Sequence, residues 1–490
     1  MVPMNVEEIA EAVNGRLVAG PASERLATSA VSDSRQAGEG SVFVAIKGER
    51  VDGHDFVPAV AAQGAVAAIV DHEVADAALS QIVVEDTVEA LGELAKHNIE
   101  RRRALDTDFD IIGLTGSVGK TTTKDLLAAL LAHVGPTVAP VGSFNNEIGL
   151  PLTALKVDER TRFFVAEMGA SHLGEIARLT RIAPPDTAIV LKVGVAHLGE
   201  FGSRERIAQA KSEIVKGLLP GGTAVLNADD EHVVPMASLA VGPVLWFGLD
   251  RTRDGEVSAE NITSDHADHA QFTLQNAQGD TVQVHLGIPG RHNVMNALAA
   301  ATVAMRYSMT MNEVADVLAA QHVISPHRMA LSTVKRQDAS FTLIDDSFNA
   351  NPDSMKAGLD GLKAWTSADG GTPFRVALLG AMLELGPDES ALHASVGSYA
   401  AGLGLDAIIA VGSDHDAHLD AMAEALAQGA QQDTGDASDA SHTTVECVHG
   451  IDQAERLVLA MADEHPDTVV LLKGSHASGL SALAERWTSN

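Results

Sequence analysis

LTGSVGKTT, residues 114–122, joins an apolar run from Phe109 to Leu114 to a helical pattern from Lys124 to Leu131. A strand, a glycine loop and a Lys-Thr pair at a helix start form a nucleotide-phosphate cradle, in which backbone N–H groups face a polyphosphate. The spacing departs from the standard Walker loop, because position 114 is Leu where that pattern has Gly. The alternative is a glycine-rich turn with a solvated lysine. We interpret the stretch as an ATP-binding loop.

Backbone and side chains of this loop have separate expected roles. Glycine lets the chain curl around phosphate, Lys120 is expected to reach the outer phosphates, and the Thr121 hydroxyl is expected to hold Mg²⁺. The expected ATP contacts in the loop are Gly116, Ser117, Val118, Gly119, Lys120, Thr121 and Thr122.

Composition bounds the class of protein. A chain of 490 residues is too long for one core, and its 46% hydrophobic but 3% aromatic content is typical of an aliphatic α/β core. The start lacks a signal-peptide pattern, and no apolar run approaches the ~20 residues that cross a bilayer. The single cysteine, Cys447, excludes an intrachain disulfide, and the net charge of −32 argues against nucleic-acid binding. We expect a cytoplasmic protein without membrane insertion.

Alternating strand and helix patterns divide the chain into three α/β units, at 1–107, 108–323 and 324–490. The central unit is expected to have a mostly parallel sheet of the P-loop type with helices on both faces, plus an acidic, strand-like insertion around 252–287. The C-terminal unit is expected to be Rossmann-like, and the N-terminal unit to be a smaller α/β domain. The small, polar segment 428–444 is interpreted as a flexible loop.

Three further side chains are candidates for chemistry in the central unit. Glu167 ends the strand FFVAEMG, and His197 follows the strand AIVLKVGVA, so both are expected at the carboxyl edge of one sheet, where functional groups gather. Together they favour metal ligation, although each alone fits a turn or loop role. Lys211, on the helix in AKSEIVKG, reads from its local sequence as a solvated helix lysine.

Asparagines mark two other candidate places. NNEIG (145–149) reads as a turn whose amides either bind ligand or cap the backbone. Asn293 and Asn296 lie one turn apart at a helix N-terminus, where asparagine is routine.

The ordered motifs resemble one family, the Mur ligases, ATP-dependent amide-bond ligases of peptidoglycan precursor synthesis. The resemblance covers essentially the whole chain, and SDSR (32–35) with VFVAIKGERVDGHDF (42–56) resembles a UDP-sugar-binding domain. Within the family, the chain is most similar to the enzymes that add D-alanyl-D-alanine to a UDP-N-acetylmuramoyl-tripeptide. The motifs that carry it are LTGSVGKTT, SFNNEIGLP (143–151), AEMGASHLGEI (166–176), AHLGEFGS (196–203), AKSEI (210–214), GRHNVMNALAA (290–300), DDSFNANPDSM (345–355), GAMLELG (380–386) and LLKGSHAS (471–478).

The resemblance implies roles that the residues alone do not. Lys211 matches a lysine that is carbamylated in these enzymes, so that it ligates a second Mg²⁺ as an anion. Glu167 and His197 match Mg²⁺ ligands, and Lys120 matches the lysine on the transferred phosphate. The remaining matches are Asn293 and Asn296 near the adenine; Arg328 and Asp346 over ribose and phosphates; Ser34, Arg35 and Lys47 on the uridine nucleotide; and Asn349, Asn351 and Ser354 near the incoming dipeptide. Asn145 and Asn146 are further candidates for substrate binding.

The reaction that the resemblance implies passes through an acyl phosphate, formed when the tripeptide carboxylate attacks the γ-phosphate of ATP. The amine of D-alanyl-D-alanine then attacks the activated carbonyl. The resemblance also favours a monomer. Two alternatives stay open: a sibling ligase that adds a single amino acid, and a P-loop NTPase regulator. NANPDSM stands where the sibling adding the third residue has DNPR, and no guanine-reading NKxD stretch occurs.

Three positions depart from the subgroup. Phe348 stands where Tyr is more usual, Pro326 and His327 precede Arg328 where Gly usually does, and His476 replaces the Arg of the commoner KGSR. These departures affect the C-terminal unit and leave the ATP and metal motifs intact.

Overall fold

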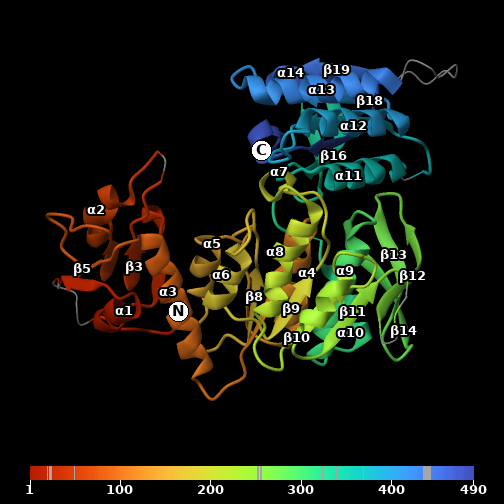
Figure 1. The fold of residues 1–490 in the computed structure, drawn as a ribbon. Helices are drawn as coiled ribbons and strands as arrows, with labels where there is room; N and C mark the ends of the chain where they lie inside the picture. The colour runs from red at the N-terminus through yellow and green to blue at the C-terminus, as the bar shows by residue number, and fades with distance from the viewer. Residues whose placement is uncertain are drawn as a thin grey trace.

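The computed structural model describes residues 1–18, 20, 25–48, 50–250, 253, 256–322, 324–336, 339–367, 369–433 and 443–489. Within them the strands form a five-stranded, a nine-stranded and a six-stranded sheet, in that order along the chain. Figure 1 shows the first sheet at the left, the second in the centre and the third above it. The boundary that we expect at residue 323 lies outside the described residues.

The N-terminal sheet has the order β1-β5-β4-β3-β2, with β1 antiparallel and the other strands parallel. Its strands are β1 (Arg16–Val18), β2 (Ser29–Val31), β3 (Ser41–Val44), β4 (Ala67–Val70) and β5 (Ser80–Val83). Its helices are α1 (Val6–Ala12), α2 (Val57–Ala62) and α3 (Thr87–Arg103), with short 3₁₀ turns at Ser34–Gln36 and Gly53–Phe56.

Helix α3 fastens this domain to the central one. One continuous hydrophobic core contains Ile9 and Leu91 of the first domain together with Ile111, Phe164 and Ile214 of the second. Buried Asn98 on α3 reinforces the junction, because its side-chain amide donates to the carbonyls of Ala154 and Val157 at 3.0 Å each. These two domains therefore share one packed interior.

The central sheet has the order β14-β13-β12-β11-β10-β9-β6-β8-β7. It is parallel from β7 to β12, and β13 and β14 extend it antiparallel. Its strands are β6 (Asp110–Thr115), β7 (Thr137–Val138), β8 (Phe163–Glu167), β9 (Thr187–Val190), β10 (Thr223–Asn227), β11 (Val244–Gly248), β12 (Val257–Ser264), β13 (His269–Gln275) and β14 (Thr281–Pro289). Its helices are α4 (Lys120–Val134), α5 (Gly149–Ala154), α6 (Glu175–Ile182), α7 (Leu198–Phe201), α8 (Arg204–Lys216), α9 (Asn293–Arg306) and α10 (Met311–Ala320), with a 3₁₀ turn at Val234–Leu239.

Alternation along the central strands gives the sheet two buried faces. On β6, Ile111 belongs to the core shared with the N-terminal domain, whereas Ile112 belongs to a second core. That second core contains residues of α4, α9 and α10, such as Leu127, Leu298 and Leu318. Helices therefore cover both faces, which explains the continuous apolar strands. The predicted insertion is confirmed as strands β12 to β14.

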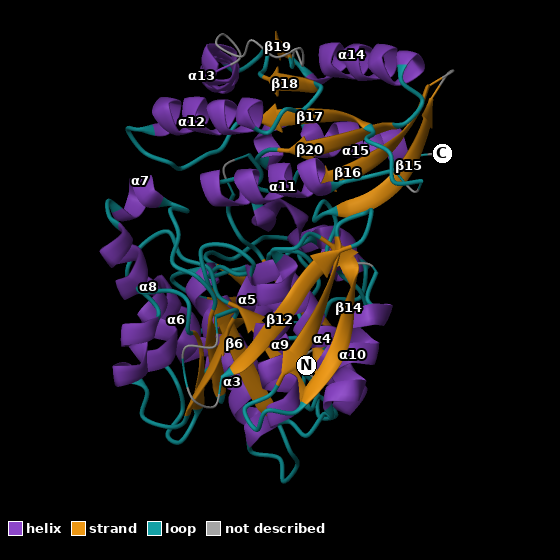
Figure 2. Ribbon diagram, turned by 90° about the vertical axis from the view of Figure 1, so that its right-hand side faces the viewer, coloured by secondary structure: helices purple, strands orange, loops and turns teal. Residues whose placement is uncertain are grey.

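The C-terminal sheet has the order β15-β16-β20-β17-β18-β19, parallel except for β15. Its strands are β15 (Ala330–Arg336), β16 (Ala339–Asp346), β17 (Phe374–Gly380), β18 (Ala407–Val411), β19 (Thr444–Val448) and β20 (Thr468–Lys473). Its helices are α11 (Pro352–Ala364), α12 (Glu389–Gly402), α13 (Ala417–Asp433), α14 (Ile451–Glu464) and α15 (Leu480–Thr488), with a 3₁₀ turn at His476–Ser478. Figure 2 shows this layered domain lying over the central sheet.

The prediction of a loop over 428–444 is wrong at its N-terminal end. Helix α13 continues to Asp433 and strand β19 begins at Thr444, while residues 434–442 lie outside the described part of the chain. Ala430 is fully buried in the C-terminal core, so packing of α13 against α12 extends the helix into a polar sequence.

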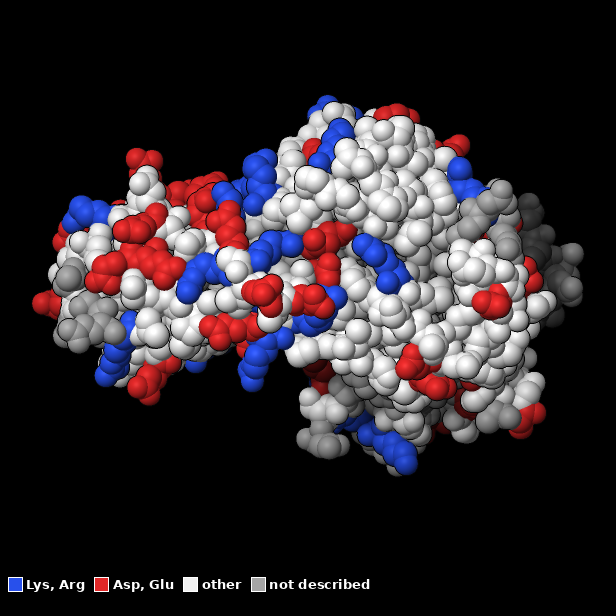
Figure 3. All heavy atoms as spheres, turned by 90° about the horizontal axis from the view of Figure 1, so that it is seen from below, with Lys and Arg blue, Asp and Glu red and all other residues white. Residues whose placement is uncertain are grey.

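Charge is unevenly spread over the face seen in Figure 3. Acidic side chains gather there toward the left, over the N-terminal domain, with Lys and Arg side chains between them. No helix of the described residues is long and apolar enough to cross a membrane.

Candidate active site

The glycine loop lies between the carboxyl end of β6 and the start of α4, as the sequence predicts. Gly119 has φ +80°, and a Cβ placed on it would lie 2.2 Å from Asn296 Oδ1, so glycine is required there twice over. The Lys120 ammonium donates to the Gly116 carbonyl at 2.9 Å and thereby closes the loop on itself. Helix α4 begins four residues earlier than predicted, at Lys120, which puts its N-terminus at the loop.

Glu167 is a buried carboxylate beside the loop, held by several hydrogen bonds. It is fully buried at the end of β8, and its Oε1 accepts from Asn145 Nδ2 at 2.7 Å and from the Thr121 and Ser143 hydroxyls at 3.4 Å each. Its Oε2 is buried and has no hydrogen-bond partner among the described residues. An unpartnered buried carboxylate oxygen beside a threonine hydroxyl fits a hard cation such as Mg²⁺.

Two buried lysines from different helices, Lys120 on α4 and Lys211 on α8, lie near enough to affect each other's charge. Lys211 on α8 is 2% exposed, and burial, with a further contribution from the charge of Lys120, lowers its pKa to about 7. Burial also lowers the pKa of Lys120, a shift that Glu167 opposes and Arg328 reinforces. Local sequence suggested that Lys211 is solvated, and that interpretation is wrong. Within the described residues no carboxylate lies within ion-pair distance of Lys211.

The C-terminal domain adds an arginine to the loop. Arg328 Nη2 donates to Thr121 Oγ1 at 3.2 Å and to Ser143 Oγ at 3.4 Å. Its guanidinium stacks over the Phe348 ring, with the central carbon 4.4 Å from the ring centroid. The departure from Tyr to Phe at position 348 thus leaves the ring available for this contact.

His197 lies in the loop after β9 with φ +57°, and its Nδ1 forms an ion pair with Glu384 of the C-terminal domain. Among the described residues, the one group of three His, Cys, Asp or Glu side chains with ligand atoms within 4.8 Å of one another is elsewhere. It comprises His54, Asp71 and His72 of the N-terminal domain, where His54 Nε2 already accepts from the Asp71 N–H.

The adenine-side asparagines are engaged within the protein. Asn296 accepts from Thr123 Oγ1 at 3.2 Å and donates to Asn293 Oδ1 at 2.8 Å, and Asn293 donates to the Pro289 carbonyl at 2.7 Å. Both side chains are buried. In this arrangement they support the glycine loop from behind.

The remaining C-terminal candidates also have intramolecular partners. Asp346 forms an ion pair with buried Lys473 at 2.6 Å. Asn351 and Ser354 form a reciprocal capping box at the start of α11, and the Asn349 carbonyl accepts from Lys473 Nζ at 2.9 Å. In this structure the capping box engages Asn351 and Ser354 with each other.

The residues predicted to bind the nucleotide-sugar follow the carboxyl ends of β2 and β3 in the N-terminal sheet. Ser34 and Arg35 form a 3₁₀ turn that Asp33 caps, and the Arg35 guanidinium pairs with Asp33 at 2.6 Å. Lys47 forms an isolated backbone bridge with Asp52. In the central domain, Asn146 caps the start of α5 by accepting from the Gly149 N–H at 2.9 Å.

Sequence reasoning missed several residues that complete the site. Ser143, Phe348 and Glu384 lie within quoted motifs, but only the folded chain brings them to Thr121, Arg328 and His197 respectively. Lys124, which the sequence predicts only as a helix residue, is fully buried and donates to the Pro140 carbonyl at 2.7 Å and to Ser325 Oγ at 3.2 Å.

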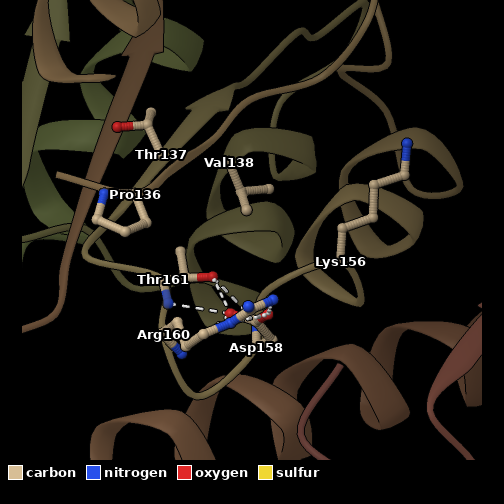
Figure 4. A pocket seen from close by; sticks show the side chains of 7 residues that line it. All are labelled: Pro136, Thr137, Val138, Lys156, Asp158, Arg160 and Thr161. Carbon is tan, nitrogen blue, oxygen red and sulfur yellow. Dashed lines mark hydrogen bonds and ion pairs between the residues drawn. The ribbon is translucent and has the colours of Figure 1, made fainter. Parts of the chain in front are cut away.

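A separate open cavity of about 300 Å³ lies at the opposite end of the central sheet, near the starts of β7 and β8. Figure 4 shows that the Asp158 carboxylate there accepts hydrogen bonds from the Arg160 guanidinium and the Thr161 hydroxyl. It is lined by Pro136, Thr137, Val138, Lys156, Asp158, Arg160 and Thr161, none of them a candidate site residue.

Three protein-family models match successive parts of the chain. The Mur ligase family catalytic domain matches residues 29–99, the Mur ligase middle domain matches 114–304, and the Mur ligase glutamate ligase domain matches 327–476. The chain belongs to the Mur ligase family.

This Mur ligase is similar to several named proteins over nearly its full length. It is 40% identical to UDP-N-acetylmuramoyl-tripeptide–D-alanyl-D-alanine ligase of Mycobacterium bovis, over 99% of this chain and 98% of that protein. The crystal structure of MurF from Acinetobacter baumannii superimposes with a TM-score of 0.83 at 31% identity, covering 99% of this chain and 98% of that one. MurF of Thermotoga maritima in complex with ADP gives 0.74 at 28% identity, covering 94% and 96%.

Proposed function

We propose that the protein is the ATP-dependent ligase that joins D-alanyl-D-alanine to a UDP-N-acetylmuramoyl-tripeptide through an acyl phosphate. The observation that carries the proposal is the full-length similarity to ligases of that name, in a chain whose glycine loop meets Glu167, Lys211 and Arg328. The product is the UDP-muramoyl-pentapeptide of peptidoglycan synthesis. The relative that holds ADP supports use of ATP at this loop.

The loop's own residues account for phosphate binding. The N-terminus of α4 directs backbone N–H groups at the phosphates, and Lys120 exchanges the Gly116 carbonyl for a phosphate oxygen. Arg328 adds a second positive charge from the C-terminal domain. These groups neutralise charge as the tripeptide carboxylate attacks the γ-phosphate, and domain docking keeps water from the acyl phosphate.

The metal ligands we propose are Thr121, Glu167, His197 and Lys211, the last as a carbamate. Thr121 and Glu167 fit one Mg²⁺, because their oxygens already face each other and Glu167 Oε2 lacks a partner among the described residues. Lys211 fits the second site only after carbamylation, since a buried ammonium repels a cation. Bound Mg²⁺ would supply positive charge that neutralises the phosphates during transfer.

The substrate sites extend outward from this centre. We assign Ser34, Arg35 and Lys47 to the uridine nucleotide, Asn145 and Asn146 to the tripeptide side, and Asn349, Asn351 and Ser354 to the dipeptide side. Asn293, Asn296 and Asp346 complete the proposed ATP site. We propose that residues 1–107 bind the UDP-sugar, 108–323 bind ATP and 324–490 close over it, in a monomeric enzyme.

The deciding experiment measures phosphate release with ATP, Mg²⁺ and UDP-muramoyl-tripeptide, adding D-alanyl-D-alanine or single amino acids in turn. Turnover with the dipeptide alone supports the proposal, and tripeptides with different third residues then define that preference. Turnover with a single amino acid would move the chain to a sibling ligase. Hydrolysis indifferent to both substrates would favour the NTPase regulator. In parallel, Lys211→Ala should abolish ligation and be partly rescued by small carboxylates, and full activity in this variant would refute the carbamate.

A further inference from the structure

The loop after β17 in the C-terminal domain packs directly on the loop that carries His197. The Glu384 carboxylate pairs with His197 Nδ1, and the Gly199 N–H donates to the Glu384 carbonyl at 3.3 Å. Side-chain and backbone groups of one loop therefore hold the other at two adjacent points.

Two glycines set how closely these loops approach. A Cβ placed on Gly199 would lie 2.5 Å from the backbone nitrogen of Gly386 and 2.6 Å from its Cα, so backbone touches backbone without room for a methyl group. His197 and Glu384 have φ values of +57° and +62°, a region that non-glycine residues seldom occupy. Such conformations persist only where the surroundings hold them. Both facing side chains are therefore presented by unusual backbone conformations at a close-packed contact.

The contact between Nδ1 and the Glu384 carboxylate has a chemical consequence for the neutral histidine ring. A neutral imidazole carries one N–H, and the nitrogen that faces a carboxylate keeps that proton. With Nδ1 on Glu384, the lone pair of His197 is on Nε2. A histidine that binds metal through one nitrogen commonly donates the other N–H to a carboxylate, which fixes the ring and strengthens the ligand.

We propose that Glu384 is a positioning residue for the ligation reaction. The C-terminal domain, when it docks, supplies the carboxylate that fixes the tautomer and orientation of His197 and so completes the metal site across the domain boundary. This inference rests on the proposed role of His197 as a metal ligand. Metal affinity is then coupled to docking. The metal site is complete only when the C-terminal domain, which also carries the residues assigned to the dipeptide, is docked.

Binding of Mn²⁺, measured by the electron paramagnetic resonance signal of the free ion in the presence of ADP, tests this coupling. Loss of a carboxylate behind a metal-bound histidine typically weakens metal affinity about 10- to 100-fold, and we expect Glu384→Ala to fall in that range. Glu384→Gln should lose less, because its amide keeps an oxygen at the position that faces Nδ1. The matched control is Asp388→Asn, which removes one negative charge from the same segment at an exposed side chain outside the contact.

A second variant separates docking from charge. Gly199→Ala keeps both His197 and Glu384, and Gly199 has no positive φ, so its added methyl group acts through the clash with Gly386. It should weaken Mn²⁺ binding as Glu384→Ala does. Gly402→Ala, where a Cβ meets no atom within 4 Å, is its control.

The His197→Ala variant separates the metal-ligand role of His197 from the positioning role of Glu384. If it weakens Mn²⁺ binding, and Glu384→Ala adds nothing further in the double variant, the coupling is supported. If His197→Ala weakens binding but Glu384→Ala does not, or if Asp388→Asn causes an equal loss, the positioning role fails while the metal assignment stands. Unchanged binding in His197→Ala would overturn the metal assignment and the inference together.

Discussion

Replacing Lys211 by Met should stabilise the metal-free, CO₂-free protein while abolishing its activity. Lys211 is buried on α8, and its pKa falls from 10.5 to about 7, chiefly through burial and further through the charge of Lys120. That difference corresponds to a free-energy cost on the order of 5 kcal/mol for holding the charged lysine in the folded protein. Methionine has a similar length and carries no charge, so it removes this cost.

The pH dependence gives the prediction its sign. The folded pKa lies below the unfolded one, so between pH 7 and pH 10.5 the unfolded chain binds the proton and the folded chain does not. Stability of the wild-type protein should therefore rise through this window by up to about 1.4 kcal/mol per pH unit from this group. The advantage of the Met variant should be greatest below pH 7 and disappear toward pH 10.5.

Urea unfolding in argon-sparged buffers with EDTA, at several values between about pH 6 and pH 9, measures this difference. Lys216→Met is the matched control, because Lys216 is exposed near the end of the same helix. An advantage of the Met variant that is equal at both extremes, or a loss of stability at the acidic one, would refute the reasoning.

The same pKa bears on carbamylation. At about pH 8 a lysine of pKa 7 is roughly 90% neutral, whereas an ordinary lysine is about 0.3% neutral, and only the neutral amine reacts with CO₂. Bicarbonate labelled with ¹³C should therefore give a carbamate resonance in the wild-type protein that is absent from Lys211→Met. No labelled carbamate in the presence of Mg²⁺ would contradict this step.

Three further substitutions test the architecture around the site. Asn296→Ala removes the acceptor of the Thr123 hydroxyl behind the glycine loop and should weaken ADP binding about tenfold, measured by calorimetry; unchanged affinity would deny the supporting role. Arg328→Lys loses the stacking on Phe348 and the planar donor, so KM for ATP should rise while the UDP-substrate KM stays unchanged. Asn98→Ala removes three buried hydrogen bonds to the backbone, and only the Ala154 carbonyl keeps another donor, the Val157 N–H, so the free energy of unfolding should fall by about 3 kcal/mol, with an unchanged urea midpoint as the contrary result.

The sequence carries the local parts of this fold. Apolar strands, the glycine loop and the helix that follows it depend on neighbouring residues, so the central sheet and its phosphate loop are predicted correctly. The prediction of a loop is wrong over 428–433 because α12 packs on α13, and no local pattern indicates that contact. Lys211 is similar: its neighbours read as a solvated helix, and only the tertiary packing shows that it is buried.

The candidate site divides in the same way. The sequence places Glu167 after its strand, but the amide of Asn145 and the hydroxyl of Ser143 reach it through folding of the loop before α5. The pairs between Arg328 and Phe348 and between His197 and Glu384 depend on loops far apart in sequence. The capping role of Asn351 can be predicted from the Asn-Pro-x-Ser pattern at the start of α11.

The core shared by the N-terminal and central domains makes the junction between them rigid. Because Leu91 and Ile111 lie in one packed interior, the distance from the proposed nucleotide-sugar site to the glycine loop is fixed in the folded protein. On that proposal, a precursor bound by its uridine end would have to span a set length to bring its carboxylate to the γ-phosphate. The carboxylate of a peptide one residue too short would lie about 3.5 Å short of the γ-phosphate. The rigid domain junction would therefore discriminate against shorter substrates.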